Sequence, residues 1–227
     1  MSINPYADAA TEKDTHVLQR TARELAGKFH GNFTPEMVER YVFESYATLG
    51  RTARIRTYLA TTAGRFAADR LRALAQSMGR LESDRPQVLF VCVQNAGRSQ
   101  IAAALLSKVS GGAVEVRSAG SLPAGEIHPL AAEVLAERGI ELADAFPKPL
   151  TDDVVRAADY VITMGCGDTC PIYPGKEYVD WDVADPQHAA LEEARAILAD
   201  IEARVVALWE HIQGNAGPHA DGADALR

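Results

Sequence analysis

The segment from Cys92 to Arg98 places a thiol and a guanidinium at the two ends of a short loop. Five residues separate them, enough for backbone N–H groups to curl around one tetrahedral oxyanion. Arg98 offers a planar fork of donors to two anion oxygens, and the same positive potential favours the thiolate of Cys92. The pattern predicts a nucleophilic cysteine facing a bound oxyanion. The residues expected to bind the anion are Val93, Gln94, Asn95, Ala96, Gly97 and Arg98.

Two neighbours support this interpretation. Ser99 can donate a hydrogen bond to the sulfur, and Asn95, which tolerates a left-handed backbone, can hold the loop shape together with Gly97. The alternative is a buried structural cysteine beside a helix-capping arginine, the usual fate of an isolated cysteine. We favour the nucleophile because a strand, the loop, Arg98-Ser99 and a helix occur in the required order.

Cys166 and Cys170 follow another apolar segment, DYVITM, in a loop rich in glycine and proline. Both this loop and the Cys92 loop are expected at the same edge of a sheet, so Cys166 can reach Cys92 and Cys170 can reach Cys166. Three thiols would then form one relay. The alternatives are a structural metal site, which lacks a convincing fourth ligand, and unrelated thiols.

Asp185 is the candidate proton donor or acceptor. It precedes Pro186 in YVDWDVADPQ, where the Asp-Pro pair places a carboxylate in a rigid turn. Asp180 and Asp182 are near rivals, and Asp185 could also be an ordinary turn residue, so spacing alone does not single it out.

The elements that must position these residues alternate between strand and helix. Residues 86–92 read as a buried strand, and a helix follows the loop; further strands are predicted at 113–116, before a turn at Ser118-Ala119-Gly120, and at 159–164. Helices are predicted at 130–140, after Thr151, and from about 188 to 213. This alternation predicts an α/β fold, a parallel sheet with helices on both faces and ligands at the carboxyl ends of the strands.

The first eighty residues predict three helices without strands, the third running from about Arg54 to Met78. Polar residues 79–86 end at Pro86 and mark a boundary. We therefore expect a three-helix bundle at 1–80, an α/β domain at 81–213 and a disordered tail at 214–227. The small core of the bundle suggests docking on the second domain or on another copy of the chain, and we expect a homodimer.

Composition and net charge limit the expected partners and cellular location of the protein. The 227 residues carry a net charge of −8, divided into +4 for residues 1–80 and −12 for the rest, so neither nucleic acid nor an anionic membrane is an expected partner. No apolar run approaches a membrane span, and the N-terminus lacks the regions of a signal peptide. Three cysteines suit a reducing compartment. We expect a cytoplasmic protein.

Several motifs together carry a family resemblance, covering about residues 86–213. FVCVQNAGRSQIAAA, RSAGSLPAGEIHPL, PKPL, VITMGCGDTCPIYPG and DWDVADPQ resemble the low-molecular-weight tyrosine phosphatase family, with its arsenate reductase branch the closer likeness. The resemblance implies a four-stranded parallel sheet, and the N-terminal helices resemble a bundle fused ahead of such modules in actinobacteria. It assigns Cys92 as nucleophile, Ser99 as the hydroxyl assisting the thiolate, Asp185 as acid, and Cys166 and Cys170 as resolving thiols.

In the reductase branch the first cysteine attacks arsenate, the second displaces arsenite while forming a disulfide, and the third moves that disulfide outward for thioredoxin. Gln187-His188 stands where the phosphatases carry tyrosines that stack on a substrate ring, so missing aromatic residues and two extra thiols favour arsenate reduction in arsenic detoxification. Three alternatives stay open: a phosphotyrosine phosphatase, an arsenate transferase that uses a small thiol such as mycothiol, and a thiol-based sensor or arsenic-binding module.

Two positions depart from the family pattern. Ala103 stands where the reductase branch often has a glutamate that binds potassium beside the loop, so the resemblance does not carry that site over. The spacing between Cys166 and Cys170 is shorter than in some relatives. We expect no metal and no cofactor, with thioredoxin as the reductant.

Overall fold

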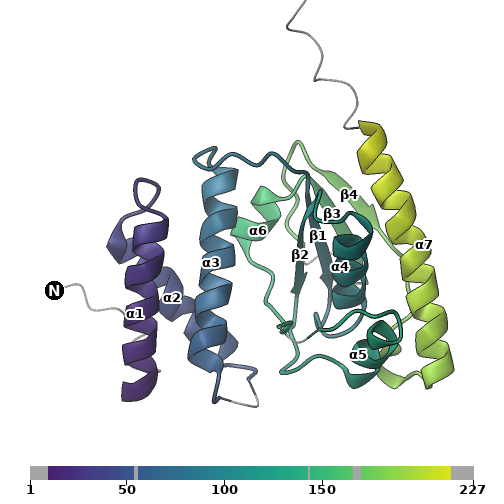
Figure 1. Cartoon of the computed structure of the whole chain (residues 1–227), viewed down its shortest axis with the longest axis horizontal. Coiled ribbons are helices and arrows are strands. Elements are labelled where there is room, and N and C mark those ends of the chain that lie inside the picture. Colours follow the sequence, from purple (N-terminus) through teal and green to yellow (C-terminus); the bar gives the residue numbers. More distant parts are fainter. Residues whose placement is uncertain (1–9, 54–55, 143, 166–169, 216–227) are drawn as a thin grey trace, which may run out of the picture.

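Four parallel strands form the centre of the molecule (Figure 1). The computed structural model describes residues 10–53, 56–142, 144–165 and 170–215. Its strands are β1 (Gln87–Cys92), β2 (Glu115–Gly120), β3 (Tyr160–Met164) and β4 (Glu177–Asp180), in the order β2-β1-β3-β4. Every residue of β1 is buried, as expected for an apolar strand covered on both faces. The predicted four-stranded parallel sheet is confirmed.

One face of the sheet packs against α4 (Arg98–Val109), α5 (Pro129–Ala136) and α7 (Leu191–Asn215). Phe90 of β1 lies in this core and contacts the ring of Trp181, with ring centroids 5.7 Å apart. Because α4 starts directly after the Cys92 loop, its N-terminus lies at the carboxyl end of β1. Packing of α4 therefore fixes the loop between two buried elements.

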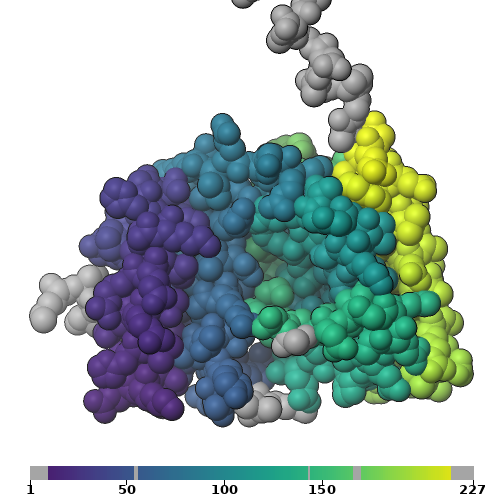
Figure 2. Space-filling view, viewed as in Figure 1, coloured from purple at the N-terminus to yellow at the C-terminus, as the bar shows by residue number. Residues whose placement is uncertain are grey.

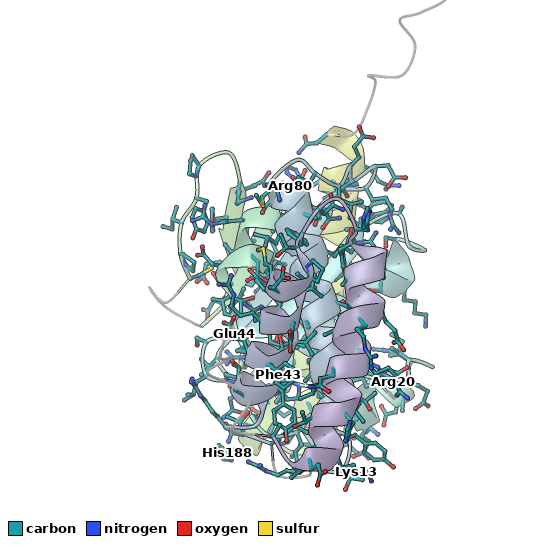
Figure 3. All side chains as sticks on the ribbon, turned by 90° about the vertical axis from the view of Figure 1, so that its left-hand side faces the viewer. Lys13, Arg20, Phe43, Glu44, Arg80 and His188 are labelled. Atoms are coloured by element: carbon teal, nitrogen blue, oxygen red, sulfur yellow. The ribbon has the colours of Figure 1, made fainter. Side chains whose placement is uncertain are left out.

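The opposite face packs against α6 (Asp152–Ala157) and one N-terminal helix, α3 (Leu59–Ser77). Ala73 of α3 is fully buried in the same cluster as Leu89 and Val91 of β1. The bundle is completed by α1 (Glu12–Lys28) and α2 (Pro35–Leu49), which lie on the far side of α3 from the sheet (Figure 1). Figure 3 faces this bundle, with Arg20 on α1 and Glu44 on α2.

Some predicted boundaries were wrong for local reasons. α3 begins at Leu59 rather than near Arg54, because Tyr58 has a non-helical backbone and the N–H of Leu59 bonds to the carbonyl of Arg56 in a turn; residues 54–55 lie outside the described part. β2 spans 115–120 because Ser118, Ala119 and Gly120, predicted as a turn, pair with Phe90, Val91 and Cys92. α5 ends at Ala136, before Gly139 with its positive φ of 68°.

The C-terminal helix also differs from its prediction. α7 begins at Leu191 rather than near His188, which lies in a 3₁₀ turn, η3 (Pro186–His188), and it continues past residue 213 to Asn215. The rest of the predicted disordered tail lies outside the described residues. No helix in the described ranges is long and apolar enough to cross a membrane.

Candidate active site

Cys92 lies at the carboxyl end of β1, only 2% exposed, as the first residue of the loop 92–98, here called the oxyanion loop. Its Sγ lies 3.0 Å from the hydroxyl of Ser99 and accepts a hydrogen bond from the backbone N–H of Asn95 at 3.2 Å. The Asn95 side chain in turn donates to Ser99 at 2.8 Å. The Asn95 N–H and the Ser99 hydroxyl thus meet at one sulfur, and hydrogen bonds donated to a sulfur favour its thiolate form.

The carbonyl groups of the oxyanion loop face away from the expected anion position. Those of Cys92, Val93, Gln94 and Ala96 accept hydrogen bonds from the backbone of segment 121–128, at 2.8 to 3.1 Å. The loop carbonyls are thereby paired outside the site, and the N-terminus of α4 adds positive potential where an anion would bind, while the N–H of Asn95 donates to the Cys92 sulfur. Gly97, the residue before α4, lies against Pro186: a Cβ there would be 3.0 Å from the proline ring.

Arg98 already holds a carboxylate. Its Nη2 donates to Asp185 at 2.6 Å, and its Nη1 donates to the carbonyl of Val183 at 3.3 Å. Asp185 therefore occupies one of the Arg98 donors that an oxyanion could use. Asp180, one of the rival carboxylates, bonds to Thr163 of the adjacent strand instead. The structure brings Asp185 to the oxyanion loop, which spacing could not decide.

Of the two further cysteines, the structure describes Cys170 but not Cys166. Cys166 lies outside the described residues, so its expected approach to Cys92 is untested. Cys170 is half-buried and packs at the edge of the cluster that contains Leu89 and Val91, with Tyr173 and Tyr178 nearby. Tyr178 fixes the chain after Cys170, because its hydroxyl donates to the carbonyl of Pro171 at 3.1 Å and accepts from the N–H of Tyr173 at 2.9 Å.

Several residues that support the loop were missed by sequence reasoning. Gln100 Nε2 lies 3.0 Å from Asn95 Oδ1, and the backbone N–H of Lys148 donates to the same oxygen at 2.8 Å. Gln94, which the sequence did place in the oxyanion loop, donates from Nε2 to Gln187 Oε1 at 3.1 Å across the rim of the site, a contact that was not predicted. The PKPL motif that contains Lys148 was noted only as part of a resemblance, and nothing in its spacing indicated contact with Asn95.

This chain lacks the glutamate that often binds potassium in the reductase branch, because Ala103 stands at that position. Ala103 lines a crevice beside the oxyanion loop but offers only a methyl group, and the ammonium of Lys148 lines the same crevice. A methyl group and an ammonium do not fit a potassium ion held from α4. Within the described ranges, no three His, Cys, Asp or Glu side chains cluster to hold a metal ion.

A cysteine at a strand end, an anion-binding loop and an aspartate facing its arginine define a phosphatase-type oxyanion site. Residues 87–217, more than half of the chain, match the family model "Low molecular weight phosphotyrosine protein phosphatase", and residues 18–75 match "Protein-tyrosine-phosphatase-like, N-terminal domain". The chain belongs to the low-molecular-weight phosphotyrosine protein phosphatase family.

The chain is similar to both arsenate reductases and phosphatases of known structure or curated sequence. The thioredoxin-dependent arsenate reductase of Corynebacterium glutamicum is 56% identical, covers 88% of this chain and 98% of its own, and superposes with a TM-score of 0.80. An arginine phosphatase of Geobacillus stearothermophilus is 30% identical, with 60% and 99% coverage and a TM-score of 0.53. A putative arsenate reductase of Halobacterium salinarum is 36% identical over 53% of this chain and 89% of its own length.

Proposed function

We propose that this chain is an arsenate reductase that uses Cys92 as its nucleophile and thioredoxin as its reductant. The carrying observation is the buried Cys92 thiol, hydrogen-bonded to Ser99 and Asn95 inside an oxyanion loop, in a chain 56% identical to a thioredoxin-dependent arsenate reductase. Arsenate and phosphate have similar size and charge, so the loop alone does not select between them. What attacks the bound adduct decides the reaction: water gives a phosphatase and a thiol gives a reductase.

In the proposed reaction, three cysteine thiols act in turn to supply the two electrons that reduce arsenate to arsenite. The Cys92 thiolate bonds to arsenic and one arsenate oxygen leaves as water, with Asp185 as proton donor. The Cys166 thiolate then attacks the Cys92 sulfur, the sulfur–arsenic bond breaks, and its electron pair stays on arsenic as arsenite leaves. Cys170 attacks Cys166 and releases Cys92. Thioredoxin reduces the resulting Cys166–Cys170 disulfide by two electrons.

Turnover in a thioredoxin-coupled assay tests this proposal. NADPH consumption is measured with arsenate, thioredoxin and thioredoxin reductase, for the intact protein and for Cys92→Ser, Cys166→Ser and Cys170→Ser. We expect turnover in the intact protein and loss of turnover in all three variants. Turnover that survives Cys166→Ser or Cys170→Ser would contradict the relay. A protein silent with thioredoxin but active with mycothiol would keep the role of Cys92 and contradict those of the other two.

Phosphatase activity is the second candidate, since an arginine phosphatase is 30% identical to this chain. The rim beside Asp185 carries Gln187, bonded to Gln94, rather than an aromatic ring. We therefore expect slow hydrolysis of phosphate esters compared with arsenate reduction. Fast ester turnover that is unchanged in Cys166→Ser would favour the phosphatase. Tight retention of arsenite without turnover would favour a sensor instead.

Self-association through the bundle is a separate proposal. It was motivated by the small core of the bundle, but the apolar faces of α1, α2 and α3 pack against one another, and α3 also packs on the sheet. Exposed Tyr58 and Met78 are left on the bundle surface as candidate contacts. Light scattering at high micromolar concentration tests the prediction, and a monomer there would contradict it.

A further inference from the structure

Residues 144–150, here called the strap, lie between the N-terminal bundle and the oxyanion loop. On the bundle side, Asp144 pairs with Arg65 of α3 at 2.7 Å, and the ring of Phe146 packs against the core of the bundle. Phe146 also lines an apolar pocket of about 410 Å³ with Leu49 and Leu59, residues of α2 and α3. The bundle therefore holds one side of the strap.

The other side of the strap holds the oxyanion loop. The backbone N–H of Lys148 donates to Asn95 Oδ1 at 2.8 Å, and the carbonyl of Phe146 and Asn95 Oδ1 both lie within 3.1 Å of Gln100 Nε2. Hydrogen bonds of 2.8 Å also join Lys148 and Leu150 to Gly120 at the end of β2. A shift of the strap thus moves the acceptors and donors that surround the Asn95 side chain.

Asn95 is the residue through which such a shift would reach the nucleophile. Its φ is +49°, a left-handed conformation that is uncommon for a residue with a Cβ and that its side-chain hydrogen bonds help to offset. Its N–H is bonded to the Cys92 sulfur and its side chain to Ser99. One chain of contacts consequently runs from α3 through the strap and Asn95 to Cys92.

Charge reinforces the link across a crevice of about 260 Å³, where the surface is hollowed between α3 and α4 (Figure 2). Asp69 of α3 faces it from the bundle and Lys148 from the strap, while Glu115 and Arg117 line it from β2. Burial lowers the pKa of Lys148, and the charge of Asp69 opposes that shift. The Lys148 ammonium also donates to the carbonyl of Phe146 at 3.3 Å and lies 4.7 Å from its ring centre.

We propose that the N-terminal bundle positions the oxyanion loop through the strap, with Phe146 and Lys148 as positioning residues. This role gives the bundle a part in anion binding without any contact between its own residues and the anion. The proposal rests on the proposed function only in that the loop binds an oxyanion. Phosphate binding and Cys92 reactivity can therefore test it whether or not arsenate is reduced.

The test uses the full chain with Cys166→Ser and Cys170→Ser, so that Cys92 is the remaining thiol. Phe146→Ala and Lys148→Met are compared with this parent in two measurements: the dissociation constant of inorganic phosphate, and the pH profile of Cys92 alkylation by iodoacetamide. We expect phosphate binding about tenfold weaker in Phe146→Ala and about fivefold weaker in Lys148→Met. The alkylation midpoint should move to higher pH in both, and Lys148→Arg should restore both readouts.

Leu18→Ala is the matched control for general loss of stability, because Leu18 is fully buried in the same bundle core but lies on α1, away from the strap. We expect this variant to unfold at lower urea while keeping the parent phosphate affinity and alkylation profile below its transition. Equal shifts in Leu18→Ala and Phe146→Ala would overturn the proposal. Unchanged phosphate affinity and alkylation in Phe146→Ala and Lys148→Met would overturn it as well.

Discussion

Gly120 shows how one missing side chain shapes the oxyanion loop. A Cβ at this position would lie 2.7 Å from the carbonyl oxygen of Val93 and 2.9 Å from the backbone nitrogen of Asn95. Both are backbone atoms, so they cannot turn aside as the end of a long side chain can. The loop and the end of β2 approach this closely because position 120 is a glycine.

Gly120→Ala should therefore displace the loop. We expect phosphate binding to weaken by about tenfold, since a small misplacement of binding groups has a large effect, and the free energy of unfolding to fall by about 1–3 kcal/mol. Phosphate titration and urea unfolding measure the two effects. Gly27→Ala is the control: Gly27 is exposed near the end of α1, with no atom within 4 Å of an added Cβ. It should keep phosphate affinity, and a wild-type affinity in Gly120→Ala would contradict the prediction.

Asp185 and a bound anion compete for Arg98, because the carboxylate bonds to Nη2 at 2.6 Å. Asp185→Asn should remove that competition together with a negative charge, so phosphate binding should tighten by roughly threefold. The chemical step should slow by about a hundredfold if Asp185 is the proton donor. Phosphate inhibition and single-turnover arsenite release measure these effects. Asp180→Asn, at the carboxylate bonded to Thr163, should change neither, and weaker phosphate binding in Asp185→Asn would count against the competition.

At the scale of elements, a buried ion cluster joins the bundle to α6. Arg70 of α3 donates to Asp153 of α6 at 3.3 Å and lies 3.5 Å from Glu44 of α2, which Figure 3 labels. Its guanidinium also covers the ring of Tyr41, 4.6 Å from the ring centre. Three helices thus meet at one arginine. Burial nevertheless raises the pKa of Asp153, while Arg70 opposes that shift.

This raised pKa gives a pH dependence of stability with a defined sign. The folded protein binds the Asp153 proton more tightly than the unfolded chain, in which the carboxyl has its ordinary pKa of 3.8. The stabilising contribution of this group to folding is therefore fully present below pH 3.8. It is lost as pH rises through the raised folded pKa. Urea unfolding of the wild type and of Asp153→Asn should be compared between about pH 4 and pH 7. As pH rises over this range, the free energy of unfolding of the wild type should fall relative to that of the variant. A difference that is constant with pH would contradict the prediction.

At the scale of the whole molecule, the bundle and the α/β part share a core. Ala73 of α3 is buried among Leu89, Val91 and Val161 of the sheet, so α3 belongs to both hydrophobic layers. Separation of the bundle would expose to water the part of this sheet face that α3 covers and α6 does not. The sequence boundary near residue 80 is therefore not expected to be a boundary of cooperative unfolding.

Two optical probes test this expectation. Both tryptophans, Trp181 and Trp209, lie in the α/β part, whereas far-UV circular dichroism also reports the bundle helices. We expect the two urea transitions to coincide. Ala73→Leu, which overfills the contact with the sheet, should lower both midpoints together, with a loss of about 1–3 kcal/mol. A helical signal lost before the fluorescence change would mean that the bundle unfolds separately.

Prediction from sequence was strongest where one pattern constrains both backbone and chemistry. The run VLFVCV predicted a strand buried on both faces, and the residues from Cys92 to Ser99 predicted a loop before a helix; the structure confirms these elements. Prediction was weaker where partners come from distant segments. The start of α3, the pairing of residues 118–120 and the end of α7 depend on turns and strand contacts that local periodicity does not encode.

The sequence by itself determined the fold class, the oxyanion loop and the family, because strand, loop and helix are adjacent in the chain and their spacing defines the chemistry. Tertiary structure alone decided that Gln100 and Lys148 hold Asn95 and that α3 covers the sheet. It also showed the contact between Arg98 and Asp185, the carboxylate that the family resemblance had selected and that spacing alone had not. Those contacts join residues as far apart as 98 and 185. They depend on how the helices pack on the sheet, and that packing cannot be predicted from a local pattern of residues.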